Sequence, residues 1–149
     1  MEPKTVLKLP SCSLNIVKNE KEEKVFDIIR KQYVSLTPEE WVRQHFVHML
    51  VNHYNYPKTA LAVEARITVN RQPKRFDILA YDANNKPLLV VECKRTDEQL
   101  TYRTLEQALA YNHTLHAPYI AITNGMETIC MKKELSEYEF TDRIPEYPA

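Results

Sequence analysis

The feature that most constrains this chain is the apolar run Leu-Leu-Val-Val at residues 88–91, which ends abruptly in Glu92-Cys93-Lys94-Arg95. Four consecutive apolar residues of this kind predict a strand that is buried on both faces. A carboxylate and an ammonium follow directly, and side chains two positions apart on a strand share one face. The sequence therefore predicts a central strand whose end presents Glu92 and Lys94 together.

The elements predicted around this strand favour one mixed β-sheet with helices packed on it. A helix is predicted to begin at Thr37-Pro38, with Thr37 as the N-cap and Glu40 completing a capping box, and to end before Pro57. Three strands, a second helix and two strands joined by a hairpin at Asn124-Gly125 follow, at residues 60–69, 75–81, 88–94, 99–116, 119–123 and 126–131. Because adjacent strands follow one another without helices, we predict an α/β (α+β) fold with a mixed central sheet and flanking helices.

The length of 149 residues suits one domain. We predict that residues 1–149 form this single domain, in three parts. Residues 1–36 are expected to form irregular structure with short strands, residues 37–134 the core, and residues 135–149 a tail whose last eight residues, DRIPEYPA, are loosely ordered.

Composition excludes several classes of protein. The only glycine is Gly125, whereas a P-loop or a dinucleotide-binding fingerprint needs more, so we expect no nucleotide partner and no ATP-driven motor. No apolar run approaches the roughly 18 residues of a membrane span. The N-terminus also lacks the apolar core of a signal peptide.

Cysteine usage and charge say less about function. The three cysteines, Cys12, Cys93 and Cys130, are widely spaced and odd in number, so we expect reduced thiols in a cytoplasmic protein. Basic and acidic residues balance at 20 each. Net charge therefore gives no support to nucleic-acid binding, although a local basic patch is sufficient for it.

The turn predicted at residues 82–87 brings two carboxylates together. If Asn84 and Asn85 are its central residues, Asp77 on one strand lies directly opposite Glu92 on the next. Facing residues project from the same side of the sheet, with Cβ atoms about 4.5–5.5 Å apart. Asp77, Glu92 and Lys94 then lie on one face.

Facing carboxylates repel, and two arrangements relieve the repulsion. The two groups can share a proton, which raises one pKa. A divalent cation relieves the repulsion better, and Mg²⁺ typically takes one or two carboxylates and keeps several waters. Lys94 beside such an ion can orient a water or neutralise charge on a phosphate. A solvated charge pair between Glu92 and Lys94 is the simplest alternative.

Basic residues lie next to the predicted site in the sequence. Arg71, Lys74 and Arg75 precede Asp77, and Arg95 follows Lys94. Contacts with a phosphate backbone would explain positive charge around these carboxylates. We predict DNA contacts for Arg75 and Arg95, with a solvated strand entry as the alternative.

Asp77 and the following Glu92-Cys93-Lys94 resemble the D…(D/E)-x-K signature of the restriction-endonuclease-like, or PD-(D/E)XK, superfamily. The ordered segments TPEEWVRQ, VEARITVN, RFDILAYD, PLLVVECK, QALAYN and ITNG together resemble the N-terminal nuclease domain of type I restriction enzyme R subunits. This resemblance covers roughly residues 36–131. An E-x-K pair alone is weakly specific, whereas the ordered set of segments is specific.

The resemblance implies a set of site residues. Asp77, Glu92 and the backbone carbonyl of Cys93 would hold Mg²⁺ or Mn²⁺, and Lys94 would position or activate the attacking water.

Four further residues have weaker support. Gln107 and Tyr111 match the Q-x-x-x-Y motif of related nucleases and share a helix face, with a packed, hydrogen-bonded pair as the alternative. Glu40, or else Glu64, would be an additional carboxylate directed at the metal. Completion of the capping box is the alternative role for Glu40.

We therefore expect a Mg²⁺-dependent DNA endonuclease of a restriction or DNA-processing system, with a non-catalytic DNA- or protein-binding module as the alternative. Because the motor motifs are missing, only the nuclease chemistry is implied. Met1 and the tail favour a stand-alone domain, with an excised domain of a longer subunit as the alternative. DNA, a second copy of the chain, or other restriction or repair subunits are the expected partners.

Overall fold

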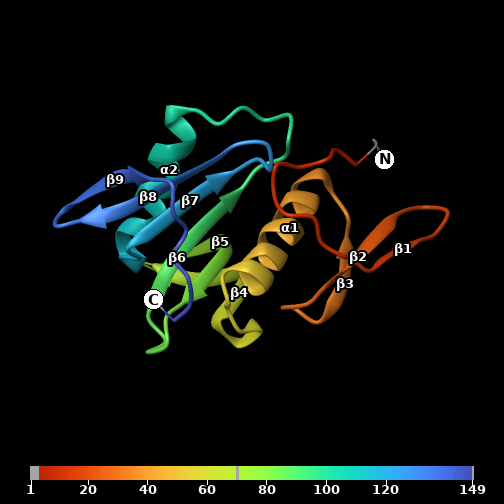
Figure 1. Cartoon of the computed structure of the whole chain (residues 1–149), viewed down its shortest axis with the longest axis horizontal. Coiled ribbons are helices and arrows are strands. Elements are labelled where there is room, and N and C mark those ends of the chain that lie inside the picture. The colour runs from red at the N-terminus through yellow and green to blue at the C-terminus, as the bar shows by residue number, and fades with distance from the viewer. Residues whose placement is uncertain (1–3, 70, 149) are drawn as a thin grey trace.

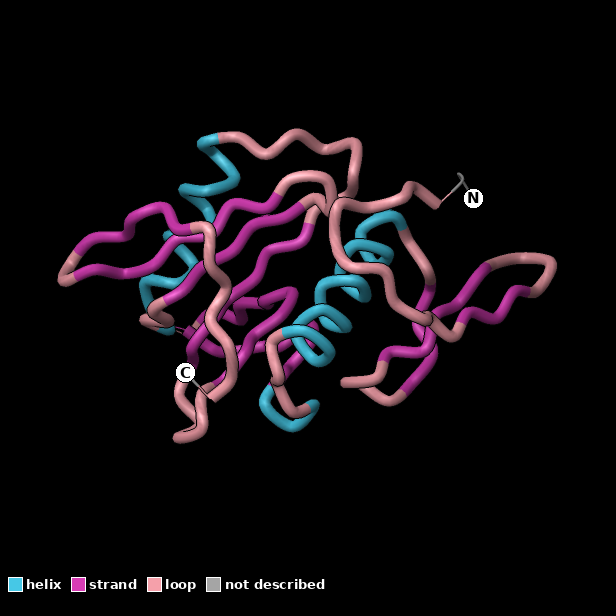
Figure 2. The backbone as a smooth tube through the Cα atoms, in the orientation of Figure 1, coloured by secondary structure: helices cyan, strands magenta, loops and turns pink. Residues whose placement is uncertain are grey.

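The computed structural model describes residues 4–69 and 71–148 of the chain. The predicted outer limits of the domain, residues 1 and 149, lie outside the described part. The described strands form two sheets, which two helices flank (Figures 1 and 2). Their bounds are β1 Ile16–Lys18, β2 Glu23–Asp27, β3 Gln32–Ser35, α1 Pro38–His53, β4 Leu61–Val69, β5 Gln72–Tyr81, β6 Pro87–Cys93, α2 Tyr102–Leu115, β7 Tyr119–Thr123, β8 Thr128–Glu134 and β9 Glu137–Thr141, with a short 3-10 turn at Lys58–Ala60.

The larger sheet has six strands in the order β4-β5-β6-β7-β8-β9. Only β6 and β7 pair in parallel, and α2 makes the crossover between them. This is the mixed sheet with flanking helices that the sequence predicts. A separate three-stranded antiparallel sheet, β1-β2-β3, lies beside α1 (Figure 1).

The two helices cover opposite faces of the six-stranded sheet. Apolar residues of α1 form a core with Ile78 and Val91, whereas Leu105 of α2 packs with Ile120 and Ile122. Leu88 to Val91 of β6 are all buried, because β6 is central and covered on both sides. The prediction of a doubly buried strand is confirmed.

The predicted alignment of β5 with β6 is confirmed, but the predicted two-residue turn is wrong. Ile78 pairs with Val91, which places Asp77 opposite Glu92 at the next position. The connection is a longer loop, residues 82–86, closed by a hydrogen bond from the Asp82 N–H to the Lys86 carbonyl. A bulge between Ala80 and Tyr81 restores the alignment, since it absorbs one residue.

Part of the predicted tail forms a further strand, β9. β9 pairs with β8 along its length, and the Tyr56 hydroxyl donates a hydrogen bond to the Pro145 carbonyl at 2.7 Å. The β8–β9 turn contains Leu135 with a φ of 56°, although branched side chains rarely adopt this left-handed conformation. Without glycine or asparagine there, the sequence carries no turn signal.

The small sheet is joined to α1 through Asp27, which has no exposed surface. The Asp27 carboxylate accepts hydrogen bonds from the backbone of Ile29 and Arg30, from Arg30 Nε at 2.7 Å and from Gln44 Nε2 at 3.0 Å. Burial alone would raise the pKa of Asp27. The bonds from the backbone and the guanidinium of Arg30 outweigh burial, so that the pKa is lowered.

We expect Asp27→Asn to lower the free energy of unfolding at neutral pH by about 3 kcal/mol, because Arg30 loses one of its two buried carboxylate partners and keeps only Glu40. Since the pKa of Asp27 is lowered by folding, its contribution is present above its unfolded value of about 3.9 and is lost as pH falls through the folded value. Urea unfolding between pH 2 and pH 7 measures both effects. The exposed Asp142→Asn variant is the control, and equal losses in the two variants would contradict the assignment.

Candidate active site

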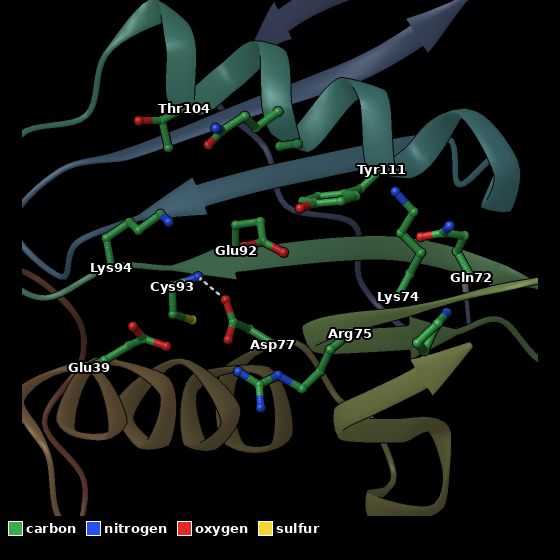
Figure 3. A pocket seen from close by; sticks show the side chains of 13 residues that line it. Glu39, Gln72, Lys74, Arg75, Asp77, Glu92, Cys93, Lys94, Thr104 and Tyr111 are labelled. Atoms are coloured by element: carbon green, nitrogen blue, oxygen red, sulfur yellow. Dashed lines mark hydrogen bonds between the residues drawn. The ribbon is translucent and has the colours of Figure 1, made fainter. Parts of the chain in front are cut away.

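A cavity of about 460 Å³ opens at the carboxyl end of β6 (Figure 3). Residues of α1, β5, β6 and α2, and Lys94 just after β6, form its walls. The lining residues are Glu39, Gln72, Pro73, Lys74, Arg75, Asp77, Glu92, Cys93, Lys94, Thr104, Gln107, Ala108 and Tyr111. The structure therefore brings the three residues predicted to be catalytic into one cavity.

The carboxylate of Asp77 is held from two sides. Its Oδ2 accepts a hydrogen bond from the Cys93 N–H at 2.8 Å, drawn as a dashed line in Figure 3. Its Oδ1 accepts a bond of 2.8 Å from Nη2 of Arg43 on α1. The backbone pairing of β5 with β6 ends at Ile78 and Val91, and beyond it the Asp77 side chain bonds the Cys93 N–H.

Glu92 faces the cavity beside Asp77 (Figure 3). Burial, then the charge of Asp77 and a hydrogen bond with it, raise the pKa of Glu92 to about 8. Lys94 acts in the opposite direction but is outweighed. The pKa of Glu92 therefore lies well above its ordinary value, as expected for a buried carboxylate that faces a second one.

Lys94 stands across the cavity from Glu39, with its side chain about 70% covered. Its backbone N–H donates to the Thr123 carbonyl at 2.8 Å, which ties the end of β6 to the end of β7. Its ammonium lies 4.0 Å from Glu98 Oε2, a loose pair that leaves the ammonium able to serve a ligand in the cavity.

Arg43 lies behind the cavity at the centre of an ion-pair cluster that the sequence analysis missed. Its Nη2 is 2.9 Å from Glu39 Oε1, 2.7 Å from Glu64 Oε1 and 2.8 Å from Asp77 Oδ1. Its Nη1 bonds Glu40 at 2.7 Å. Glu39 and Glu40 precede Arg43 by four and three residues, a helix spacing that favours ion pairs and was the available signal.

Of the two candidate supporting carboxylates, neither lines the cavity. Glu40 is buried, and its carboxylate accepts bonds from Arg30, Arg43 and Gln44. Thr37 caps the helix as predicted by accepting the Glu40 N–H, but the carboxylate of Glu40 is engaged in this cluster. The first-helix carboxylate that lines the cavity is its neighbour, Glu39.

Glu64 reaches the cluster through an unusual backbone conformation. It lies between the paired residues Val63 and Ala65 of β4 and has a φ of 55°. Such a conformation is costly for a residue other than glycine and persists where the surroundings enforce it. It brings the Glu64 carboxylate to Arg43 and, at 3.1 Å, to Arg75.

Gln107 and Tyr111 line the cavity from α2, as expected for two residues on one helix face. In the part of the chain that the structure describes, no hydrogen bond joins these two side chains. The ring of Tyr111 instead has the Lys74 ammonium 4.8 Å from its centroid and the Phe76 ring at its edge.

The sequence of the chain also matches a known protein family. Residues 38–145 match the family described as type I restriction enzyme R protein N terminus. The chain belongs to this family. No curated protein sequence matches the chain.

A solved structure shares the fold of this R protein N-terminal family member. It is a fragment described as an HsdR subunit of a type I restriction enzyme from Vibrio vulnificus YJ016, with a TM-score of 0.58 and 21% identity. The match covers 74% of this chain and 24% of that chain, so the present chain spans about a quarter of that relative. It supports the α+β fold with a mixed central sheet and flanking helices.

The two arginines that were predicted to contact DNA differ in their positions. Arg75 lines the cavity, whereas Arg95 pairs with Asp97 at 2.7 Å and is not among the lining residues.

Among the described helices of this R protein N-terminal family member, none has the length and apolar character needed to cross a membrane.

Proposed function

We propose that this chain is a metal-dependent phosphodiesterase that acts on DNA within a restriction system. The observation that carries the proposal is the facing pair Asp77 and Glu92 at the end of β6, inside a cavity that Lys94 also lines. Membership of the type I restriction R protein family supports DNA as the substrate. Other subunits of the restriction enzyme, or a second copy of the chain, are the proposed protein partners.

The donor set suits Mg²⁺ or Mn²⁺. Asp77, Glu92 and the backbone carbonyl of Cys93 would hold the ion with hard oxygen ligands. The raised pKa of Glu92 supports this choice, since a cation between the two carboxylates would oppose the burial and the repulsion from Asp77 that raise it. When bound, the ion supplies Lewis-acid stabilisation of the charge that develops on the phosphate.

The side chains of the cavity would divide the remaining work. Lys94 holds the attacking water or neutralises charge on the scissile phosphate, because its ammonium has only a loose partner in Glu98. Lys74 and Arg75 line the β5 side of the cavity and would contact neighbouring phosphates. Gln107 and Tyr111 would orient the substrate from α2, where Tyr111 offers an aromatic ring.

A second candidate is a module that binds DNA without cutting it. The contact between Arg43 and Asp77 favours it, because a guanidinium already neutralises one of the carboxylates that would hold the ion. Cleavage of supercoiled plasmid and single-stranded DNA with Mg²⁺ or Mn²⁺, beside an EDTA control, separates the two functions. DNA binding that is salt-sensitive but independent of metal, with no cleavage, would replace the first candidate by the second.

We expect Lys94→Ala to reduce metal-dependent cleavage by about 10²–10⁴-fold, the range typical of a positioned proton-transfer group. Mn²⁺ affinity should change little, since the lysine is not a proposed ligand. The matched control is Lys86→Ala, an exposed lysine in the β5–β6 turn at the other end of β6. Plasmid nicking rates and Mn²⁺ titration provide the two readouts, and wild-type cleavage by the Lys94 variant would remove it from the mechanism.

A further inference from the structure

Three carboxylates converge on a single nitrogen behind the candidate active site. Nη2 of Arg43 lies 2.7–2.9 Å from oxygens of Glu39, Glu64 and Asp77, which come from α1, β4 and β5. Carboxylate oxygens gathered around one point are the ligands that hard divalent cations use. In this chain, a guanidinium occupies that point.

The cluster is built into the fold. The Arg43 side chain is only 6% exposed, so that its ion pairs differ from those of solvated surface residues. Its Nε is buried without a hydrogen-bond partner among the described residues. Glu64 reaches it only by adopting a φ of 55° within a strand. A buried cation and a costly backbone conformation are therefore both maintained at this contact.

The position of Asp77 links the cluster to the proposed metal ligands. Oδ1 of Asp77 contacts Arg43. Asp77 also lies opposite Glu92, and both line the cavity. Without Arg43, the carboxylates of Glu39, Glu64, Asp77 and Glu92 would surround one space with few opposing charges. Lys74, Arg75 and Lys94 line the same cavity, and the side chain of Arg75 is 59% exposed.

We propose that Arg43 is a positioning residue that takes the place of a second divalent ion: its guanidinium gathers Glu39, Glu64 and Asp77 and leaves room for one ion, between Asp77 and Glu92. This inference rests on the proposed function, because it assigns the number of ions in the same site. It also gives Glu39 and Glu64 a role beside the proposed metal ligands, because both bind the guanidinium of Arg43 in place of an ion.

The test is a count of bound Mn²⁺ by titration calorimetry and electron paramagnetic resonance on the full chain. We expect one ion in the wild type, none in Glu92→Gln, and one more than the wild type in Arg43→Ala. The extra ion should disappear in the double variant Arg43→Ala/Glu64→Gln, because one of its ligands is then neutral. Folding is checked by circular dichroism with and without Mn²⁺.

The outcomes separate the two proposals. A folded Arg43→Ala chain that binds the same number of ions as the wild type overturns the inference, whatever that number is. A wild type that binds no Mn²⁺, like Glu92→Gln, overturns the proposed function. If Arg43→Ala folds only when Mn²⁺ is present, the inference is supported.

Arg43→Lys decides the matter if Arg43→Ala is unfolded even with Mn²⁺. A lysine keeps the charge but reaches fewer carboxylates than the planar guanidinium does. We expect Mn²⁺ to raise the melting temperature of Arg43→Lys by more than it raises that of the wild type. An equal rise in the two proteins overturns the inference.

Discussion

Glu92→Gln is expected to abolish metal-dependent cleavage while the protein stays folded. The change removes a proposed metal ligand but keeps the size of the side chain. Even outer-shell partners of a bound metal are worth about 10–100-fold in affinity or activity, so we expect a loss of more than about a hundredfold. Cleavage of supercoiled plasmid with Mg²⁺ measures the loss. Glu106→Gln, an exposed glutamate of α2, is the matched control.

The same variant changes how stability depends on pH. The pKa of Glu92 is raised by folding to about 8, mainly by burial and by Asp77. Its contribution to stability in metal-free protein is therefore fully present below the unfolded value of about 4.3 and is lost as pH rises through about 8. We expect urea unfolding in EDTA to show a fall in stability from pH 5 to pH 8 that is smaller in Glu92→Gln.

Two results would contradict this assignment. Wild-type cleavage by Glu92→Gln would exclude Glu92 as an essential ligand. The same pH dependence in the variant and the wild type would show that Glu92 ionises normally in the folded protein. Asp77→Ala is a less clean test of catalysis, because it also removes the partner of Arg43 and of the Cys93 N–H.

Arg43→Met is expected to cause the largest loss of stability, about 3–5 kcal/mol at neutral pH. Methionine preserves much of the apolar length of the side chain but leaves the carboxylates of Glu39, Glu40, Glu64 and Asp77 without their shared cation. Removing one partner of a buried ion pair typically costs this amount, because the remaining charge is left uncompensated. Urea unfolding gives the difference directly.

The loss should depend on pH. Burial and the charge of Asp77 already raise the pKa of Glu39, and the charge of Arg43 opposes them, so removing Arg43 raises that pKa further. A raised pKa contributes stability at low pH that is lost as pH rises, so that the deficit of Arg43→Met should be smaller at pH 4 than at pH 8. Arg103→Met, at an exposed position of α2, is the control. A deficit that is the same at both values would show that lost packing, rather than charge, is the cause.

Local sequence was sufficient for the elements that depend on short-range patterns. The apolar run at 88–91 predicted the central strand, because burial on both faces leaves no polar positions. Alternation along β5 and β6 then placed Asp77 and Glu92 on one face. The turn between them was predicted in the wrong form, and the bulge at Ala80 and Tyr81 compensated for the difference.

Other features depended on contacts that no local pattern encodes. β9 was missed, because its turn uses Leu135 at a positive φ in place of a residue that signals a turn. Glu40 was considered as the carboxylate near the metal, yet Glu39 lines the cavity, since adjacent residues of a helix project in different directions. Which of two neighbouring glutamates faces the site depends on how α1 packs on the sheet.

Local sequence is sufficient to place a carboxylate and a lysine two residues apart at the end of β6, opposite a second carboxylate, since strand periodicity and hairpin pairing are short-range properties. The residues that surround this group depend on long-range packing. Arg43 meets Glu64 and Asp77 across 21 and 34 residues of chain. Such a contact exists because α1 packs against β5 and β6, and it is this packing that puts a buried cation among the carboxylates.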